Sequence, residues 1–295
     1  MKHAFLIIAH KNWNQLILLL RQIDALNHDI FIHVDKKAKG VPVKRIKEAV
    51  RYSKICIYSE YSVFWGGYEL VQTELFLYGK AHAIGYDYYH LLSGQDLLLV
   101  SPDKFDTFFE DNNGFEFIEF KEDQLNNDPE IGRRARYYHF LQNYRRRYKE
   151  QWKNTFFTTI ERCLLAAQIV LGINRLSKEE WTIKYGSNWT SITNALVEAI
   201  LEKNDKIEHI FRFTNCSDEL ITQTIAYNCG FKGKIYPGGN MRYIDWGRSR
   251  NGNPYIFRNE DFPSLINSGK LIARKFSEDV DLDIITRIVE ATVRG

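Results

Sequence analysis

Hydrophobic residues in the first 120 positions form short apolar runs that alternate with longer amphipathic segments. Residues 4–9 are apolar without interruption, which is typical of a strand buried on both faces of a sheet. Further strands are predicted at 29–34, 54–58, 86–92 and 115–120. Helix and strand signals that alternate in this way favour an α/β fold with a Rossmann-like sheet between helices.

The helices between these strands carry recognisable start signals. Asn12 is expected to cap the first helix, whose apolar positions extend through Leu26, and a basic helix is expected at 43–52. Paired glycines precede a third helix at 68–83. Ser101 is followed by proline, so a fourth helix is expected to begin there.

The middle of the chain differs because basic and aromatic residues interleave there. Residues 133–162 contain nine Arg or Lys and only two Glu. Two helices are predicted, and the second continues into the apolar stretch 163–173. From about Trp181 the mixed pattern returns, and a last strand is predicted at 271–276.

With no low-complexity linker and no internal repeat, the sequence predicts one domain over residues 1–295. It divides into a first half at about 1–120, a helical insertion at about 121–180, and a second half at about 181–295.

Composition narrows the function classes. A formal net charge of +3 and a pI near 8.5 are too close to neutrality for a nucleic-acid-binding chain. The four cysteines form no Cys-x-x-Cys pair, so buried free thiols are expected rather than disulfides or zinc. No secretory signal is visible, and no apolar run approaches the roughly 20 residues that span a bilayer. We therefore expect a cytoplasmic protein, with peripheral contact at the inner membrane face left open.

Several polar residues follow predicted strands, where open α/β sheets bind ligands. Asp35 follows the strand at 29–34 and could accept hydrogen bonds from a nucleotide, although a capping role is the alternative. Trp65 and Gly66 precede the helix at 68–83, where glycine allows a backbone to approach a phosphate or sugar. Gln95 and Asp96 follow the strand at 86–92, in a segment that taken alone is a turn.

Two further segments lie in the second half. Glu219 stands in the first turn of a predicted helix. Its negative charge either interacts favourably with the helix dipole or serves as a general base. The strand at 271–276 contains two adjacent cations, Arg274 and Lys275. After it, Asp279, Asp281 and Asp283 alternate in an Asp-x-Asp pattern, which we interpret as caps of a terminal helix rather than metal ligands.

These segments occur in the order found in a known family. The chain resembles the core-2/I-branching β-1,6-N-acetylglucosaminyltransferases of glycosyltransferase family 14, which also contains peptide O-xylosyltransferases. The resemblance covers nearly the whole chain. Seven motifs carry it: His33-Val34-Asp35-Lys36-Lys37, residues 63–75, Leu92-Ser93-Gly94-Gln95-Asp96, Gly186-Ser187-Asn188-Trp189, Ser217-Asp218-Glu219, Ile244-Asp245-Trp246 and Ala273-Arg274-Lys275-Phe276.

The resemblance implies a GT-A-like fold and an inverting transfer from a UDP-sugar, most simply UDP-GlcNAc, to a glycan hydroxyl without an essential metal. It implies that Asp35 contacts the uridine, Glu219 is the general base, Lys275 holds the diphosphate and Trp246 lies at the acceptor site. An arginine that assists the lysine matches either Arg248 or Arg250. Fixed cations can stabilise the departing diphosphate where related enzymes use a divalent ion.

By the same resemblance we expect three more residues on the donor side and three more on the acceptor side. The donor residues are His10, Trp65 and Gly66, and the acceptor residues are Gln95, Asp96 and Trp189. The disulfides, anchor and stem of the animal enzymes are absent from this sequence, which suggests a bacterial-type enzyme of surface polysaccharide synthesis, with a lipid-linked acceptor left open.

Three alternatives remain at this stage. A transferase of xylose or another UDP-sugar would use the same residues. A glycoside hydrolase would draw two acids from Asp96, Asp218 and Glu219. A binding module without catalysis would use residues 133–162 against anionic lipid headgroups, whereas the simplest interpretation of that stretch is a solvated helix face over buried aromatics.

Overall fold

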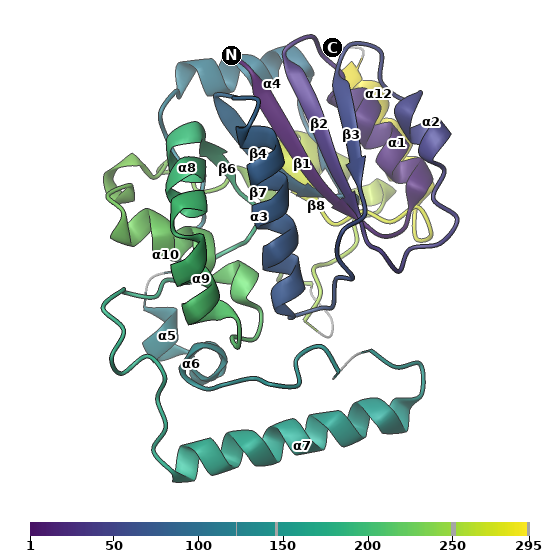
Figure 1. The fold of residues 1–295 in the computed structure, drawn as a ribbon. Coiled ribbons are helices and arrows are strands. Elements are labelled where there is room, and N and C mark those ends of the chain that lie inside the picture. The colour runs from purple at the N-terminus through teal and green to yellow at the C-terminus, as the bar shows by residue number, and fades with distance from the viewer. Residues whose placement is uncertain (122, 145–146, 249–251, 294–295) are drawn as a thin grey trace.

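The computed structural model describes residues 1–121, 123–144, 147–248 and 252–293 (Figure 1). A five-stranded sheet has the order β3-β2-β1-β4-β6. Its first four strands are parallel, and β6 is antiparallel to β4. The strands are β1 (His3–Ala9), β2 (His28–Val34), β3 (Lys54–Tyr58), β4 (Tyr88–Ser93) and β6 (Ser191–Thr193).

A smaller sheet of order β5-β8-β7 follows the end of β4. Its strands are β5 (Asp96–Leu98), β7 (Arg242–Ile244) and β8 (Ile272–Arg274). β8 runs antiparallel to β5, with Asp96 paired to Arg274, and parallel to β7. This pairing carries the C-terminal cations to the edge of the main sheet where the polar loops lie.

Helices cover both faces of the main sheet because its central strands are buried on both sides (Figure 1). In β1 the side chains of Phe5 and Ile7 join one core with α1, α2, α4, α11 and α12, while Leu6 joins the other with α3, α8, α9 and α10. The helices of the first face are α1 (Trp13–Gln22), α2 (Val43–Lys47), α4 (Pro102–Asp111), α11 (Phe262–Ile266) and α12 (Leu282–Val293). Those of the second are α3 (Tyr68–His82), α8 (Asn194–Glu202), α9 (Asn204–Phe211) and α10 (Ile221–Asn228).

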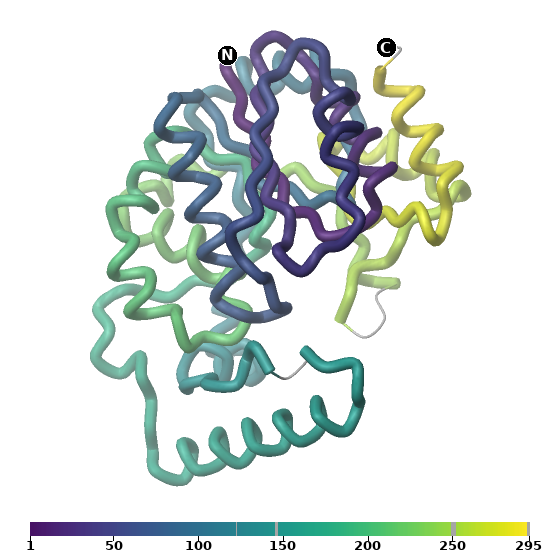
Figure 2. Tube along the Cα trace, turned by 45° about the vertical axis from the view of Figure 1, so that its right-hand side comes forward, coloured from purple at the N-terminus to yellow at the C-terminus, as the bar shows by residue number. Residues whose placement is uncertain are grey.

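The middle of the chain forms a helical excursion on one end of the molecule (Figure 2). It contains α5 (Gln124–Asn127), α6 (Pro129–Arg136) and α7 (Gln151–Val170). Short 3-10 helices complete the fold at Ser217–Glu219, Lys232–Lys234 and Asn259–Asp261. The mixed sheet between helices and the helical middle segment confirm the predicted α/β class.

Several local predictions were wrong in detail. The segment 115–120 is not a strand, because it makes only isolated bridges, from Glu116 to Ile235 and from Phe117 to Ser191. The helix expected at 43–52 ends at Lys47. Asn12 occupies the N-cap position of α1 as expected, but its side chain makes no capping hydrogen bond and its amide donates to Ser277 Oγ at 3.0 Å instead. The segment 279–283 does start a helix as expected, since Asp281 accepts the backbone N–H of Ile284 at 3.1 Å.

Candidate active site

A cavity of about 260 Å³ lies where the loops after the strands of both sheets meet. It contains residues from all three parts of the chain, including both halves expected to form the site. Eight predicted site residues line it: His10, Trp65, Gly66, Gln95, Trp189, Glu219, Trp246 and Lys275. The predicted base and the predicted diphosphate-binding lysine therefore share one cleft.

Glu219 ends the 3-10 helix that precedes α10, and its backbone is fixed by Gly186, whose N–H donates to the Glu219 carbonyl at 3.0 Å. Gly186 is needed there because a Cβ would lie 1.8 Å from the Glu119 carbonyl oxygen. Glu219 Oε2 accepts a hydrogen bond from Arg134 Nη1 at 3.1 Å, and the side chain keeps 28% exposure. Burial raises the pKa of Glu219, and the charge of Arg134 opposes that rise.

Two other carboxyls belong to the surroundings of Glu219: Asp218, which lines the same cavity, and Glu74, which interacts electrostatically with Asp218. Burial raises the pKa of Asp218 to about 7, and the charge of Glu219 adds to the rise. Burial and the charge of Asp218 raise the pKa of Glu74 well above its usual value. Glu219 accepts a guanidinium hydrogen bond and reaches solvent, so its surroundings favour ionisation more than those of the other two.

The same cleft carries two cations. Lys275 follows β8, and burial lowers its pKa, helped by the charges of Arg274 and Lys11. Arg274 lines the same cavity, with its guanidinium carbon 4.1 Å from the centre of the Trp189 indole. Its Nη1 also donates to Asp96 Oδ1 at 2.8 Å. Crowded, partly buried cations of this kind gain stability when an anion binds between them.

Asp96 was predicted to contact the acceptor, but it does not line this cavity. Its buried carboxylate accepts hydrogen bonds from the Ser93 N–H and hydroxyl, both at 2.8 Å, and from Arg274. Gln95 does line the cavity, and its side-chain amide donates to the Phe276 carbonyl at 3.1 Å. Asp96 therefore holds Arg274 in place rather than facing the cleft.

Asp35 also lies just outside the cavity lining. It follows β2, and its carboxylate accepts hydrogen bonds from the Lys37 N–H and ammonium group, both at 2.9 Å. His10, which follows β1 and lines the cavity, has a pKa lowered by burial, while the charge of Asp35 opposes the shift. Asp35 is thus close enough to His10 to act on it electrostatically.

Trp65 and Gly66 form part of the rim. Gly66 has a positive φ of 77°, and its carbonyl accepts the N–H of Cys216 at 3.0 Å. A Cβ at Gly66 would lie 2.8 Å from the Asn215 side chain. The close approach that glycine permits here is therefore to the segment before Glu219. The Trp65 side chain is half exposed at the edge of the cleft.

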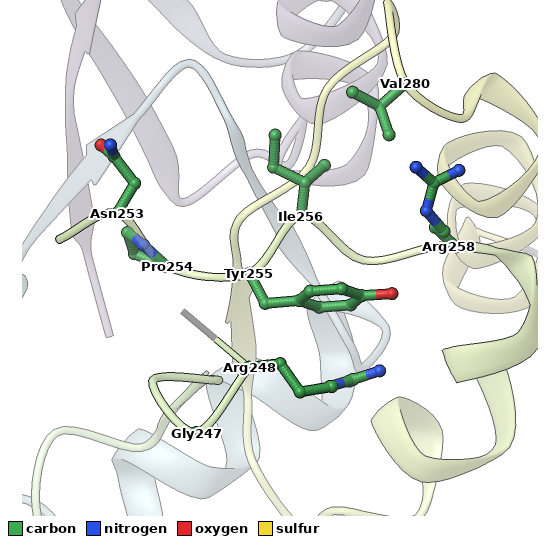
Figure 3. Close-up of a pocket in the computed structure, with 8 residues that line it drawn as sticks. All are labelled: Gly247, Arg248, Asn253, Pro254, Tyr255, Ile256, Arg258 and Val280. Carbon is green, nitrogen blue, oxygen red and sulfur yellow. The ribbon is translucent and has the colours of Figure 1, made fainter. Parts of the chain in front are cut away.

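Arg248 points into a neighbouring cavity of about 710 Å³ (Figure 3). Its Nε lies 2.6 Å from Asp245 Oδ2, its Nη1 lies 2.8 Å from Asp261 Oδ1, and the guanidinium stacks on Tyr255. The structure therefore does not bring Arg248 together with Lys275, and Arg250 lies outside the described residues. The two cavities share the short segment Asn253-Pro254.

Sequence reasoning missed several residues of the cleft. Arg134 belongs to the basic middle segment, and nothing in its spacing indicates a bond to a glutamate 85 positions later. Lys121, Tyr185 and Glu119 line the cavity without any motif to mark them. Arg274 had a signal, since it adjoins Lys275 at a strand end, but no role was assigned to it.

In the described part of the chain, His3, His28 and Asp106 are the one group with the spacing to hold a metal ion. His28 Nε2 contacts Asp106 Oδ1 directly at 2.7 Å. His3 opens β1 whereas His10 follows it, so this group lies roughly 20 Å from the cleft, at the opposite edge of the sheet. It does not contribute to the candidate active site.

The fold and this cleft define an α/β protein with a candidate site at the carboxyl edge of its sheet. The chain belongs to the core-2/I-branching enzyme family, whose model matches residues 3–266. The resemblance inferred from the seven motifs is thereby confirmed at the level of the family.

A xylosyltransferase of Ciona intestinalis is 22% identical over 309 residues, which cover 97% of this chain and 33% of the relative. The chain thus spans about a third of that relative's length.

Among solved structures, mouse xyloside xylosyltransferase 1 in its apo form matches with a TM-score of 0.38 and 8% identity, over 92% of this chain and 96% of that one. Core-mannan synthase A from Aspergillus fumigatus, in a Mn/GDP form, matches with a TM-score of 0.35 and 14% identity, over 75% of this chain and 68% of that one. TM-scores below 0.5 do not by themselves indicate a shared fold.

Proposed function

We propose that the chain is a single GT-A-like domain that transfers a sugar from a UDP-sugar to a glycan hydroxyl with inversion and without a metal ion. Family membership supports the reaction class. The observation that carries the mechanism is that Glu219 and Lys275 line the same cavity. A carboxylate and a fixed cation in one cleft are what a single displacement from a nucleotide-sugar requires.

In this mechanism the acceptor hydroxyl attacks the anomeric carbon from the face opposite UDP. Its proton passes to Glu219, the bond between the anomeric carbon and the diphosphate oxygen breaks, and the electron pair leaves with UDP. Lys275 and Arg274 stabilise the negative charge that develops on the diphosphate. Because one displacement occurs, the configuration at the anomeric carbon inverts.

The donor sugar has two candidates. UDP-GlcNAc follows from the sequence motifs, and UDP-xylose is favoured by the relative named a xylosyltransferase. His10, Trp65 and Gly66 would lie on the donor side with Asp35 behind them, and Gln95, Trp189 and Trp246 on the acceptor side. We further propose a role in bacterial surface polysaccharide synthesis at the cytoplasmic face of the membrane, with a lipid-linked acceptor.

The test measures UDP release with each donor and a panel of oligosaccharide acceptors. Glu219→Gln should lower kcat by at least about 100-fold, because general-base catalysis contributes about 10²–10⁴-fold. Glu202→Gln, an exposed carboxyl change on α8, should leave kcat unchanged. Normal turnover by Glu219→Gln would refute the base assignment.

A binding measurement separates the donor site from the chemistry. UDP should raise the melting temperature of the wild type and of Glu219→Gln alike, whereas Lys275→Ala should lose most of that shift. Lys104→Ala, an exposed lysine change on α4, should retain it. Turnover should persist in EDTA, and loss of turnover that returns with Mn²⁺ would refute metal independence.

A further inference from the structure

Helix α7 turns a polar side inward, whereas an ordinary surface helix turns its apolar side inward. Of its 20 residues, the two that are buried are polar, Glu161 and Gln168. Glu161 accepts hydrogen bonds from His139 Nδ1 at 2.9 Å and from the Leu141 N–H at 3.2 Å. Gln168 Oε1 accepts the Tyr138 N–H at 2.8 Å, and Gln168 Nε2 donates to the Tyr138 carbonyl at 3.0 Å. The helix is therefore held by its polar side to residues 138–141 of the same excursion, and Phe157 adds ring contacts with Tyr144 and Tyr148.

The side that faces away from Glu161 is mostly apolar. With about 100° per residue, Trp152, Phe156, Cys163 and Val170 fall within about 40° of one another, and Glu161 lies on the opposite side. We call these four residues the outer stripe. Trp152 is 67% exposed, Phe156 55% and Val170 86%. The exposed Thr159 lies in the same sector, between Phe156 and Cys163 along the helix. An exposed, mostly apolar surface of this kind marks an interaction site.

Basic residues border the outer stripe. Lys153 and Arg162 lie about 80–100° to either side of it on the helix, and the exposed Lys149 stands just before the helix begins. Such long side chains can keep their charge in a headgroup layer while the helix enters deeper. The excursion also exposes Phe140 and Tyr144.

This charge distribution selects one kind of partner. Two copies of the chain joined through their outer stripes would place two sets of Lys149, Lys153 and Arg162 around one interface, which is unfavourable because residues 149–170 contain only Glu150 and the buried Glu161 as acids. An anionic bilayer offers apolar acyl chains to the stripe and negative headgroups to the flanking cations. No described helix is long and apolar enough to cross a membrane, so α7 would lie in the interface plane.

We infer that the outer stripe of α7 and its flanking lysines and arginine dock the protein on the surface of an anionic lipid bilayer. The inference rests on α7 alone and holds whether or not the chain transfers sugar. Figures 1 and 2 show α7 beyond the end of the main sheet where β1 and β2 terminate. The cleft lies at this same end of the sheet, since His10 and Gln95 follow β1 and β4, so docking would hold this end of the molecule near a bilayer.

The test is flotation of the full chain with phosphatidylcholine vesicles that contain 30–40% phosphatidylglycerol, compared with pure phosphatidylcholine, at about 50 and 500 mM NaCl. Binding is expected to anionic vesicles and to weaken in high salt. Trp152→Ser combined with Val170→Ser should lower the partition coefficient at least tenfold, because two exposed apolar side chains no longer enter the lipid. Replacing Lys149, Lys153 and Arg162 by Gln should cost about fivefold per residue on anionic vesicles.

The matched controls are Leu26→Ser with Ile84→Ser, which removes exposed apolar residues elsewhere, and Lys44→Gln with Lys104→Gln. Both pairs should bind like the wild type. Apart from the half-buried Lys153, which pairs with the exposed Glu150 at 3.3 Å, the variants change exposed side chains, so their melting temperatures should stay close to that of the wild type.

Absence of wild-type binding at low salt, or equal loss in the outer-stripe and control variants, would overturn the inference. So would equal binding to neutral vesicles. A dimer in sedimentation equilibrium that the outer-stripe variant dissociates, without vesicle binding, would assign the surface to a second copy instead.

Discussion

Arg134 should set the pH at which kcat/KM falls on the acid side, because it lowers the pKa of Glu219. Under the proposed mechanism Glu219 accepts a proton only when it is ionised, so activity falls as pH drops through the pKa of Glu219. Burial raises that pKa and Arg134 lowers it. Arg134→Gln removes the opposing charge, so the pKa must rise further and the acid limb of kcat/KM must move to higher pH.

The magnitude follows from the geometry. Arg134 Nη1 lies 3.1 Å from Glu219 Oε2. Opposite charges about 4 Å apart interact by about 4 kcal/mol at an effective dielectric constant of 20. The two side chains are 21% and 28% exposed, and Glu130 shares the guanidinium at 2.9 Å, so we halve this to about 2 kcal/mol. That corresponds to a shift of about 1.5 pH units.

The assay is UDP release at subsaturating donor between about pH 5 and 9, for the wild type, Arg134→Gln and Arg133→Gln. Arg133 is the neighbour on α6, exposed and bonded through Nε to the Pro129 carbonyl, so its profile should match that of the wild type. At high pH the Arg134 variant should approach wild-type activity. An acid limb that coincides with the wild type would refute the role of Arg134.

Two further predictions concern stability. Gly186→Ala should lower the free energy of unfolding by about 1–3 kcal/mol, because its methyl group would press on the Glu119 carbonyl. The control Gly233→Ala adds a methyl group in open space and should not show this loss. Urea denaturation measures both variants. Burial lowers the pKa of His3 to about 4, so this side chain stays neutral in the fold while the unfolded chain protonates near pH 6.5. Unfolding free energy should therefore fall by roughly 2–3 kcal/mol between pH 6.5 and 4, and His3→Asn should flatten that slope.

The main sheet could be predicted because its signals are local. The apolar run at 4–9 became β1, and the helix after Ser101 begins at Pro102 as its proline indicated. The segment 115–120 has the same kind of local pattern, but whether it forms a strand depends on its partners. Glu116 and Phe117 each make one isolated bridge, to Ile235 and to Ser191, so no ladder develops.

The candidate site could be predicted where a local sequence motif marks its residues. Glu219 and Lys275 were selected on separate motifs, and the fold brings both to one cavity. The contacts that surround them were not predictable, because Arg134 reaches Glu219 only through tertiary packing. The orientation of α7 was also hidden, since a sequence shows an amphipathic helix without showing which side faces the body.

The first and last residues of the helical excursion, Lys121 and Tyr185, lie next to each other. Lys121 and Tyr185 form an antiparallel bridge, and the Lys121 N–H donates to the Tyr185 carbonyl at 3.0 Å. Because its two ends already touch, the intervening chain can be exchanged for one of another length without changing the register of any strand. Grafting a different excursion between these anchors would be a direct route to redirect where the protein is held, provided that a cation is kept beside Glu219.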